Sequence, residues 1–175
     1  MSQTPFGVEQ QILYFSTTAG GATPAVANQV GEFRGEPVIN LTWANATWRG
    51  QDRFAKHSVR HDGDGSASIP GFTFDASEAI TKFLNGTHTQ ATTLHGGSAA
   101  AREDKVAKNT KPLSGEWVIE GLNTADAKKF QIILHNAFLT GVNPTIGRTD
   151  FAATDLALTL LADASGDVVS FVNET

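Results

Sequence analysis

Hydrophobic and polar residues alternate in several short stretches of the chain, and this period of two predicts β-strands with one buried face. The first stretch, Gln11–Phe15, is rich in β-branched and aromatic residues and is followed by a turn of Gly, Ala and Thr. A second stretch, Val30–Trp48, begins irregularly and then alternates. We expect Ile39, Leu41 and Trp43 to face inward from it.

An acidic, glycine-containing segment, Asp62–Gly65, predicts a tight turn, because Gly tolerates positive φ and Asp hydrogen-bonds its own backbone. The residues before it, 53–60, and after it, 66–74, both have the composition of strands. The sequence therefore predicts a hairpin built from these two segments.

The segment Asp75–Gly86 predicts the one helix of the chain. Asp75 is a suitable N-cap, Gly86 follows the end, and Ala79, Ile80, Phe83 and Leu84 share one face. Residues 87–112 follow without a strong period, and we expect them to form a long loop.

Four further strands are expected at 116–122, 129–139, 155–162 and 168–172, and a turn over Asp163–Asp167 is expected to join the last two as a hairpin. Many strands with one helix predict a mainly β fold, a β-sandwich or barrel with one packed α-helix and the long loop at 87–112. At 175 residues, the chain has the size of a single domain spanning 1–175.

The composition excludes several classes of function. Cysteine is absent, so disulfides, thiolate metal sites and cysteine nucleophiles are excluded. The formal net charge of −5 and the pI near 5.4 argue against tight binding to nucleic acid phosphates. Neither a signal peptide nor an apolar run of membrane-spanning length is present, so we expect synthesis in the cytoplasm and no membrane partner.

The histidines are the first residues to test for a metal site. His57 and His61, with Asp62 and Asp64 nearby, could supply ligands, but on a strand the two histidines lie about 13 Å apart. The Asp62–Gly65 segment lacks the spacing and the closing Glu of a calcium loop. The sequence therefore predicts neither a metal site nor a cofactor site.

Catalytic motifs are also absent: the chain has no Gly-x-Ser-x-Gly, phosphate-binding loop, His-Glu-x-x-His or dinucleotide fingerprint. His88 and His95 lie in the predicted loop, where surface exposure or a subunit contact is expected. An enzyme would need a His–Asp pair made by the fold, at His57, His61 or His135. We therefore predict no catalytic residue and no enzymatic activity.

The aromatic residues could form a binding platform for sugars or bases in a monomeric ligand-binding module. Because they fall within strand patterns, packing in the core or an interface is the favoured interpretation. The residues concerned are Trp43, Trp48, Trp117, Phe33, Phe72, Phe74, Phe130, Phe138 and Phe151.

The order of these features resembles the major tail tube proteins of long-tailed bacteriophages. The resemblance rests on Val30–Glu32 at the start of the first main sheet, the predicted helix over 75–84, and the closing strand at 155–163. It spans nearly the whole chain.

The resemblance implies a structural virion protein that assembles with itself. Its subunits would form hexameric rings whose inner strands close into one barrel, and the rings would stack into a tube in the phage tail. Partners would be other copies of the chain and other tail proteins at the tube ends, and DNA would only pass through an acidic lumen. No cofactor is implied.

A phage head decoration protein is the alternative within the same class. Such a protein is also small and β-rich, and it would clamp a capsid lattice as a trimer, with the Ala-, Gly- and Thr-rich N-terminal region as a docking arm. A tube protein should polymerise alone into hollow filaments, whereas a decoration protein should stay small without a capsid.

Overall fold

The computed structural model describes residues 8–49, 55–74, 85–93, 97, 100–105, 111–123, 126–145 and 153–175. These residues contain ten β-strands and no helix, which confirms the mainly β prediction. The predicted helix lies almost entirely on residues 75–84, outside the described residues. The strands are β1 (Val8–Ser16), β2 (Gln29–Phe33), β3 (Val38–Arg49), β4 (Ala55–Phe74), β5 (Thr87–Thr93), β6 (Ala100–Lys105), β7 (Ser114–Asn123), β8 (Lys129–Thr145), β9 (Ala153–Leu161) and β10 (Val169–Asn173).

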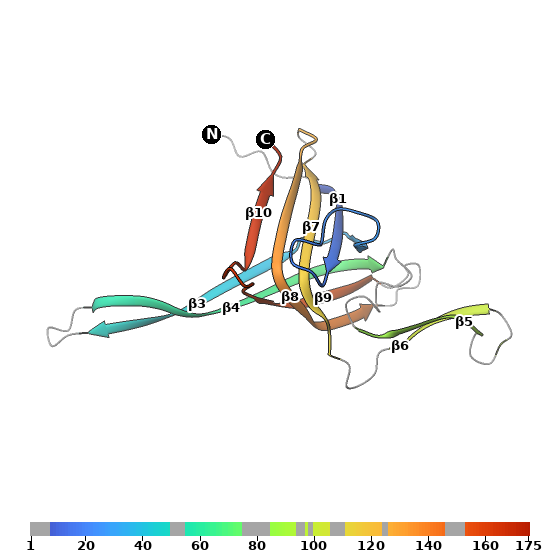
Figure 1. Cartoon of the computed structure of the whole chain (residues 1–175). Coiled ribbons are helices and arrows are strands. Elements are labelled where there is room, and N and C mark those ends of the chain that lie inside the picture. The colour runs from blue at the N-terminus through green and yellow to red at the C-terminus, as the bar shows by residue number, and fades with distance from the viewer. Residues whose placement is uncertain are drawn as a thin grey trace.

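Six strands close into a barrel (Figure 1). Each strand pairs antiparallel with the next in the order β1, β2, β4, β9, β8 and β7, and β7 pairs with β1 to complete the circuit. Closure removes the open edges of these strands over the paired residues. Strands β3 and β10 are attached outside the circuit, β3 to β4 and β10 to β8.

Strand β8 is long enough to serve two neighbours on one side. Its residues 130–134 pair with β10 and its residues 136–145 pair with β9, while β7 pairs on the other side. The predicted hairpin between the last two strands is therefore wrong. The turn is present, with Gly166 at φ +88°, but the chain leaves it along the free side of β8 instead of returning along β9.

The turn predicted at Asp62–Gly65 is also wrong, because these residues lie inside β4, where Gly63, Asp64 and Gly65 pair with β3 and Asp62 lies at a register shift. The glycines give space for close packing. A Cβ on Gly63 would lie 3.1 Å from Trp43 Cδ1, and a Cβ on Gly65 would lie 2.8 Å from Leu160 Cβ. The two predicted hairpin strands are thus one strand, and its hairpin partner is β3.

The β3–β4 hairpin reaches beyond the barrel. Residues 55–64 of β4 pair with β3 alone, whereas residues 65–68 pair with both β3 and β9. We call the part of this hairpin beyond Thr42 and Asp64 the arm. In Figure 1 the arm projects from one side of the body.

The prediction of a long loop at 87–112 is wrong where β5 and β6 lie, because these strands form a separate two-stranded antiparallel sheet. Sequence periodicity did not indicate these strands. Their composition is dominated by Thr, Ala and charged residues, so they have no apolar face whose alternation could mark them.

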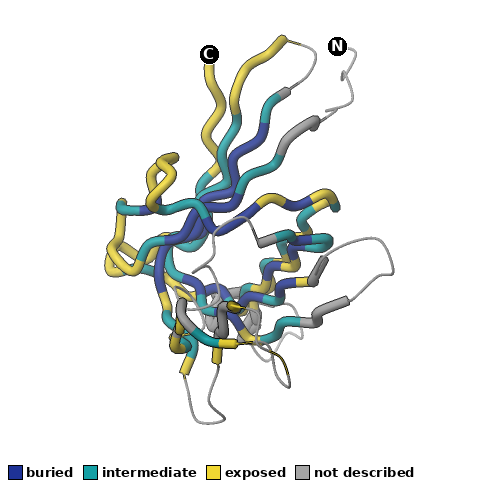
Figure 2. Tube along the Cα trace, turned by 90° about the vertical axis from the view of Figure 1, so that its right-hand side faces the viewer, coloured by how far each residue is buried: buried dark blue, intermediate teal, exposed yellow. Residues whose placement is uncertain are grey.

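The core lies inside the barrel, where the strands cross in the middle of Figure 2. Trp117 is fully buried, its ring centroid lies 4.7 Å from that of Phe15, and its Nε1 donates a hydrogen bond to the Ala137 carbonyl oxygen. The predicted packing role of Phe33, Phe72 and Trp117 is confirmed by their burial.

Trp43 differs from the other predicted inward residues. Ile39 and Leu41 are half-buried and pack against the core, as expected. Trp43 follows the same alternation but is 53% exposed. The reason is that β3 passes the edge of the body at this point and continues into the arm, so the inner face of the strand has less to pack against.

Candidate assembly surfaces

One side of the barrel wall is a four-stranded sheet with two open edges. It consists of β3, β4, β9 and residues 136–145 of β8. Among the described residues, β3 pairs only with β4, and residues 139–145 of β8 pair only with β9 because the pairing with β7 ends at Phe138. Pro144 lies in this part of β8, and proline within a strand is typical of a sheet edge.

The opposite side of the barrel offers one open edge. Its strands are β10, the first half of β8, β7, β1 and β2, and β2 continues the wall by pairing with β4. Within the described part of the chain, β10 has β8 as its one neighbour. The four-stranded sheet is therefore the part of the described wall that can be extended from both sides.

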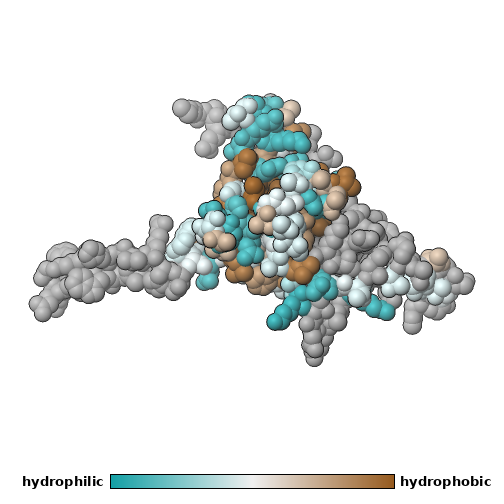
Figure 3. Space-filling view, in the orientation of Figure 1, coloured by the Kyte–Doolittle hydropathy of each residue, from teal (hydrophilic) through white to brown (hydrophobic). Residues whose placement is uncertain are grey.

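The exposed large hydrophobic residues lie partly on these edge strands. Phe171 on β10 is 67% exposed and lines a shallow groove of about 290 Å³ with Phe130 and Ile132 of β8. In Figure 3, hydrophobic residues of the body form several separate patches among hydrophilic ones. The groove beside β10 is thus a local apolar surface at an open edge.

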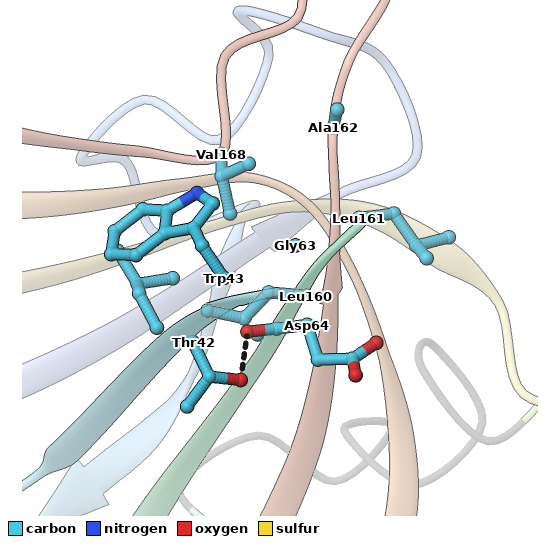
Figure 4. Close-up of a pocket in the computed structure, with 10 residues that line it drawn as sticks. Thr42, Trp43, Gly63, Asp64, Leu160, Leu161, Ala162 and Val168 are labelled. Atoms are coloured by element: carbon cyan, nitrogen blue, oxygen red, sulfur yellow. Dashed lines mark hydrogen bonds between the residues drawn. The ribbon is translucent and has the colours of Figure 1, made fainter. Parts of the chain in front are cut away.

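A second groove, of about 300 Å³, lies at the root of the arm (Figure 4). The Trp43 ring lies next to Val168 on one side of the sheet, while the Asp64 carboxylate points away from it. Thr42 Oγ1 donates a hydrogen bond of 3.3 Å to the Asp64 carbonyl oxygen, which links β3 and β4 at the point where the arm leaves the body.

The loop between β1 and β2 is fastened to the side of the molecule that faces away from the four-stranded sheet. The buried Glu116 carboxylate accepts hydrogen bonds from the backbone N–H groups of Gly20 and Ala22, and Ala22 packs against Tyr14 and Val118. This fixed loop presents Val26, which is 87% exposed.

A polar network lies near this loop. The Glu120 carboxylate, 8% exposed, accepts hydrogen bonds from Lys129 Nζ at 3.1 Å and Gln131 Nε2 at 2.8 Å. The hydrogen bond and charge of Glu120 raise the pKa of Lys129. Burial, and then the Glu120 charge, raise the pKa of Tyr14. Glu120 and Lys129 therefore form an ion pair with each other.

The fold does create a His–Asp pair at His135, one of the positions considered for an enzyme. His135 Nε2 lies 2.7 Å from Ser170 Oγ, and His135 Nδ1 lies 3.8 Å from Asp163 Oδ2. The second distance exceeds a hydrogen bond, so Asp163 does not orient the ring as the carboxylate of a Ser-His-Asp triad does.

Asp163 is instead a turn residue. Its Oδ1 accepts hydrogen bonds from the backbone N–H groups of Ser165 and Asp167. The backbone hydrogen bond from Asp167 is the largest cause that lowers the pKa of Asp163, and His135 contributes. These contacts stabilise the turn between β9 and β10, which pair with successive parts of β8.

The other histidines form no described site. His57 and His61 lie on β4 and His88 lies on β5, and their side chains, like His95, are outside the described residues. Where the side chains are described, no group of three or more His, Asp or Glu residues could hold a metal ion. No helix of the described residues is long and apolar enough to cross a membrane.

Comparison with known proteins finds solved structures of similar fold. No protein-family model matches the chain, and no curated protein matches it in sequence. A chain of an extracellular contractile injection system, the PVC sheath–tube complex in the extended state, matches with a TM-score of 0.54 at 13% identity, covering 98% of this chain and 94% of that chain. The chain shares its fold with components of contractile injection systems.

Two more structures support this similarity. A chain of the anti-feeding prophage cap, a tube-terminating cap, matches with a TM-score of 0.53 at 16% identity over 99% of this chain and 95% of that chain. A chain of the PVC sheath/tube terminator in the extended state matches with a TM-score of 0.55 at 11% identity, covering 98% and 99%. At these identities the comparison shows the fold.

The open edges of β3 and β8 were not predicted from the sequence. The second half of β8 contains Gly141 and Pro144, which ordinarily mark the end of a strand. The second half of β8 could have been predicted from the apolar alternation of Ala137, Leu139 and Val142, if one bulge is allowed between Leu139 and Gly141.

Proposed function

We propose that the chain is a structural subunit that assembles with itself into the tube of a phage tail or a phage-like contractile particle. The observation that carries the proposal is the four-stranded sheet with open edges on opposite sides, β3 and residues 139–145 of β8. Similarity to chains of injection-system structures named for their sheath, tube and cap supports the same role.

Two different edges make the contact heterologous: β3 of one copy pairs with β8 of the next. A heterologous contact produces a ring if the rotation between copies closes. We propose stacked hexameric rings in which the four-stranded sheets form one continuous wall. Open strand edges, which in a monomer would favour aggregation, are then the joints of the ring.

The partners in this proposal are other copies of the chain within and between rings, and terminating proteins at the tube ends. DNA passes through the tube without being held, in agreement with the net charge of −5. The proposal assigns the chain to the particle and gives it no catalytic role and no cofactor.

Negative-stain electron microscopy of the purified chain at rising concentration tests the proposal. We expect hollow tubes with a regular axial repeat. Particles that remain small in the absence of other components would contradict self-assembly into tubes and would favour the head decoration alternative, which adding capsid would then test.

Cross-linking tests the joint itself. The chain contains no cysteine, so single cysteines can be introduced at exposed positions without interference, as Asn40→Cys on β3 and Thr140→Cys on β8. A short bismaleimide should link the two variants into mixed dimers when they assemble together. Val26→Cys, in the β1–β2 loop, is the matched control and should not link to Asn40→Cys. Tubes without a β3–β8 cross-link would contradict this joint.

A further inference from the structure

Asparagine followed directly by glycine occurs once in the 175 residues, at Asn85 and Gly86. This pair lies immediately before β5, whose pairing with β6 begins at Thr87 opposite Lys105. The side chain of Asn85 is exposed, and its backbone has a φ of +54°. The pair therefore lies in a surface connection, outside the strands of both sheets.

An Asn-Gly pair can react with itself. The backbone nitrogen of Gly86 attacks Cγ of the Asn85 side-chain amide, and ammonia leaves as the new C–N bond closes a cyclic imide. Water then opens this ring at one of its two carbonyl groups, which gives either aspartate or isoaspartate. One water molecule is consumed and one ammonia is released, so the reaction is balanced with water as its only co-reactant. Glycine favours it because no Cβ obstructs the attack.

The backbone at this pair opposes the reaction only weakly. The left-handed region is unfavourable for a residue that has a Cβ, although asparagine tolerates it better than most residues do. Departure from this conformation therefore costs Asn85 little. In the described part of the chain, the β5–β6 register starts after both residues of the pair. The chain can thus rotate at Asn85 and Gly86 without breaking strand pairing.

A related pair, Asp64 and Gly65, is held in the opposite way. Asp64 is also exposed, but Gly65 pairs with Leu41 of β3 on one side and with Leu160 of β9 on the other. Rotation of the backbone there would break pairing on both sides of β4. The two pairs are therefore alike in exposure and in the glycine that follows, and they differ in how firmly the backbone is confined.

We propose that Asn85 is a site of spontaneous deamidation, which converts it to aspartate and isoaspartate in the folded chain. Each event replaces a neutral amide by a carboxylate, so the formal net charge of −5 becomes more negative by one. The isoaspartate product also inserts a carbon atom into the main chain directly before β5. Ageing of the protein thus alters the base of the β5–β6 hairpin. This modification needs no partner, so it stands apart from the proposed tube function.

Peptide mass spectrometry of the dispersed chain, incubated at neutral and at mildly alkaline pH, tests the proposal. We expect the peptide containing Asn85 to gain the mass difference between an amide and a carboxyl group. The gain should be faster at the higher pH, because the Gly86 nitrogen attacks after it loses its proton. Asn85→Gln should remove the gain, because the longer side chain closes the ring far more slowly. A gain that persists in Asn85→Gln would assign the reaction to another residue and overturn the inference.

Asp64→Asn is the matched control, because it creates a second Asn-Gly pair within β4. In the folded protein this second pair should react at least about tenfold more slowly than Asn85 and Gly86, whereas in urea the two pairs should react at similar rates. Equal rates at the two pairs in the folded protein would contradict the role of backbone confinement. A gain at Asn85 in urea but none in the folded protein would show that the fold protects Asn85. Either result overturns the inference.

The unsubstituted chain provides a second measurement if Asp64→Asn does not fold. The rates at Asn85 in the folded chain and in urea should then agree within about tenfold, as expected for a site that needs no unfolding to react. A larger difference would overturn the inference. The presence or absence of tubes has no bearing on these results, so the modification and the proposed function fail or stand separately.

Discussion

The Glu116 carboxylate accepts a hydrogen bond of 3.0 Å from the backbone N–H of Ala22, across 94 residues of sequence, and a second of 2.8 Å from Gly20. Glu116 is 6% exposed, so its buried carboxylate has these two backbone groups as hydrogen-bond donors. The strand β7 thereby holds the loop between β1 and β2 in one conformation, and this contact can be tested by substitution.

We expect Glu116→Gln to lower the free energy of unfolding by about 1–3 kcal/mol, because the amide group places a donor against a buried backbone N–H. Urea denaturation of dispersed subunits measures the change. Glu32→Gln, at an exposed position of β2, is the control and should stay close to the unsubstituted chain. Equal stability of the two variants would show that the loop does not depend on Glu116.

Gly65→Ala tests the packing that explains glycine in the middle of β4. The added Cβ would lie 2.8 Å from Leu160 Cβ, so the two strands must separate. We expect a loss of about 1–3 kcal/mol in the free energy of unfolding, typical of overpacking. Ser68→Ala on the same strand, at an exposed position, should have little effect. A neutral Gly65→Ala would mean that β9 adjusts without loss.

The β5–β6 hairpin can be removed cleanly, because Thr87 and Lys105 are directly paired and an Asn-Gly turn can join them. The hairpin belongs to a sheet separate from that of the barrel. We therefore expect the melting temperature of the dispersed subunit to be unchanged. A two-stranded hairpin is marginally stable alone, so we expect this hairpin to contact a neighbouring copy and tube formation to be lost without it. Normal tubes would show that the hairpin makes no essential contact between copies; a lowered melting temperature would show that it supports the barrel.

Asp163 predicts a dependence of stability on acid. Backbone hydrogen bonds hold the pKa of this carboxyl below its ordinary value of 3.8. A lowered pKa in the folded state stabilises the fold above the unfolded pKa, and this contribution is lost as the pH falls through the folded pKa. Urea denaturation from about pH 5 to about pH 3 should show a smaller decline for Asp163→Asn than for the unsubstituted chain. An equal decline in both would contradict the prediction, and Glu32→Gln controls for the loss of a carboxylate.

The sequence predicted the strands that have a buried face and misplaced the segments that do not. Leu13, Ile119 and Leu158 lie on strands whose alternation reflects burial, and β1, β7 and β9 were found close to their observed bounds. Strands β5 and β6 are stabilised by pairing with each other, which leaves no hydrophobic period to detect.

Glycine also misled the prediction of strands, because Gly63 and Gly65 were taken to mark a turn. At Gly63 and Gly65 the residue serves close packing between strands, whereas the same residue in the turn after Asp163 serves a positive φ. Sequence alone does not distinguish these two uses. The open edges of β3 and β8 depend on which strands pair, and long-range pairing is a property of the whole chain that no local pattern carries.

Strand β8 also has a mechanical consequence. Its first half is bonded to β10 through five residue pairs, and its second half belongs to the four-stranded sheet. The hydrogen bonds between antiparallel strands run across the strand direction. A pull on the C-terminal end along β10 therefore loads all of these pairs together in shear, and one continuous backbone transmits the load directly into the sheet that we assign to the tube wall.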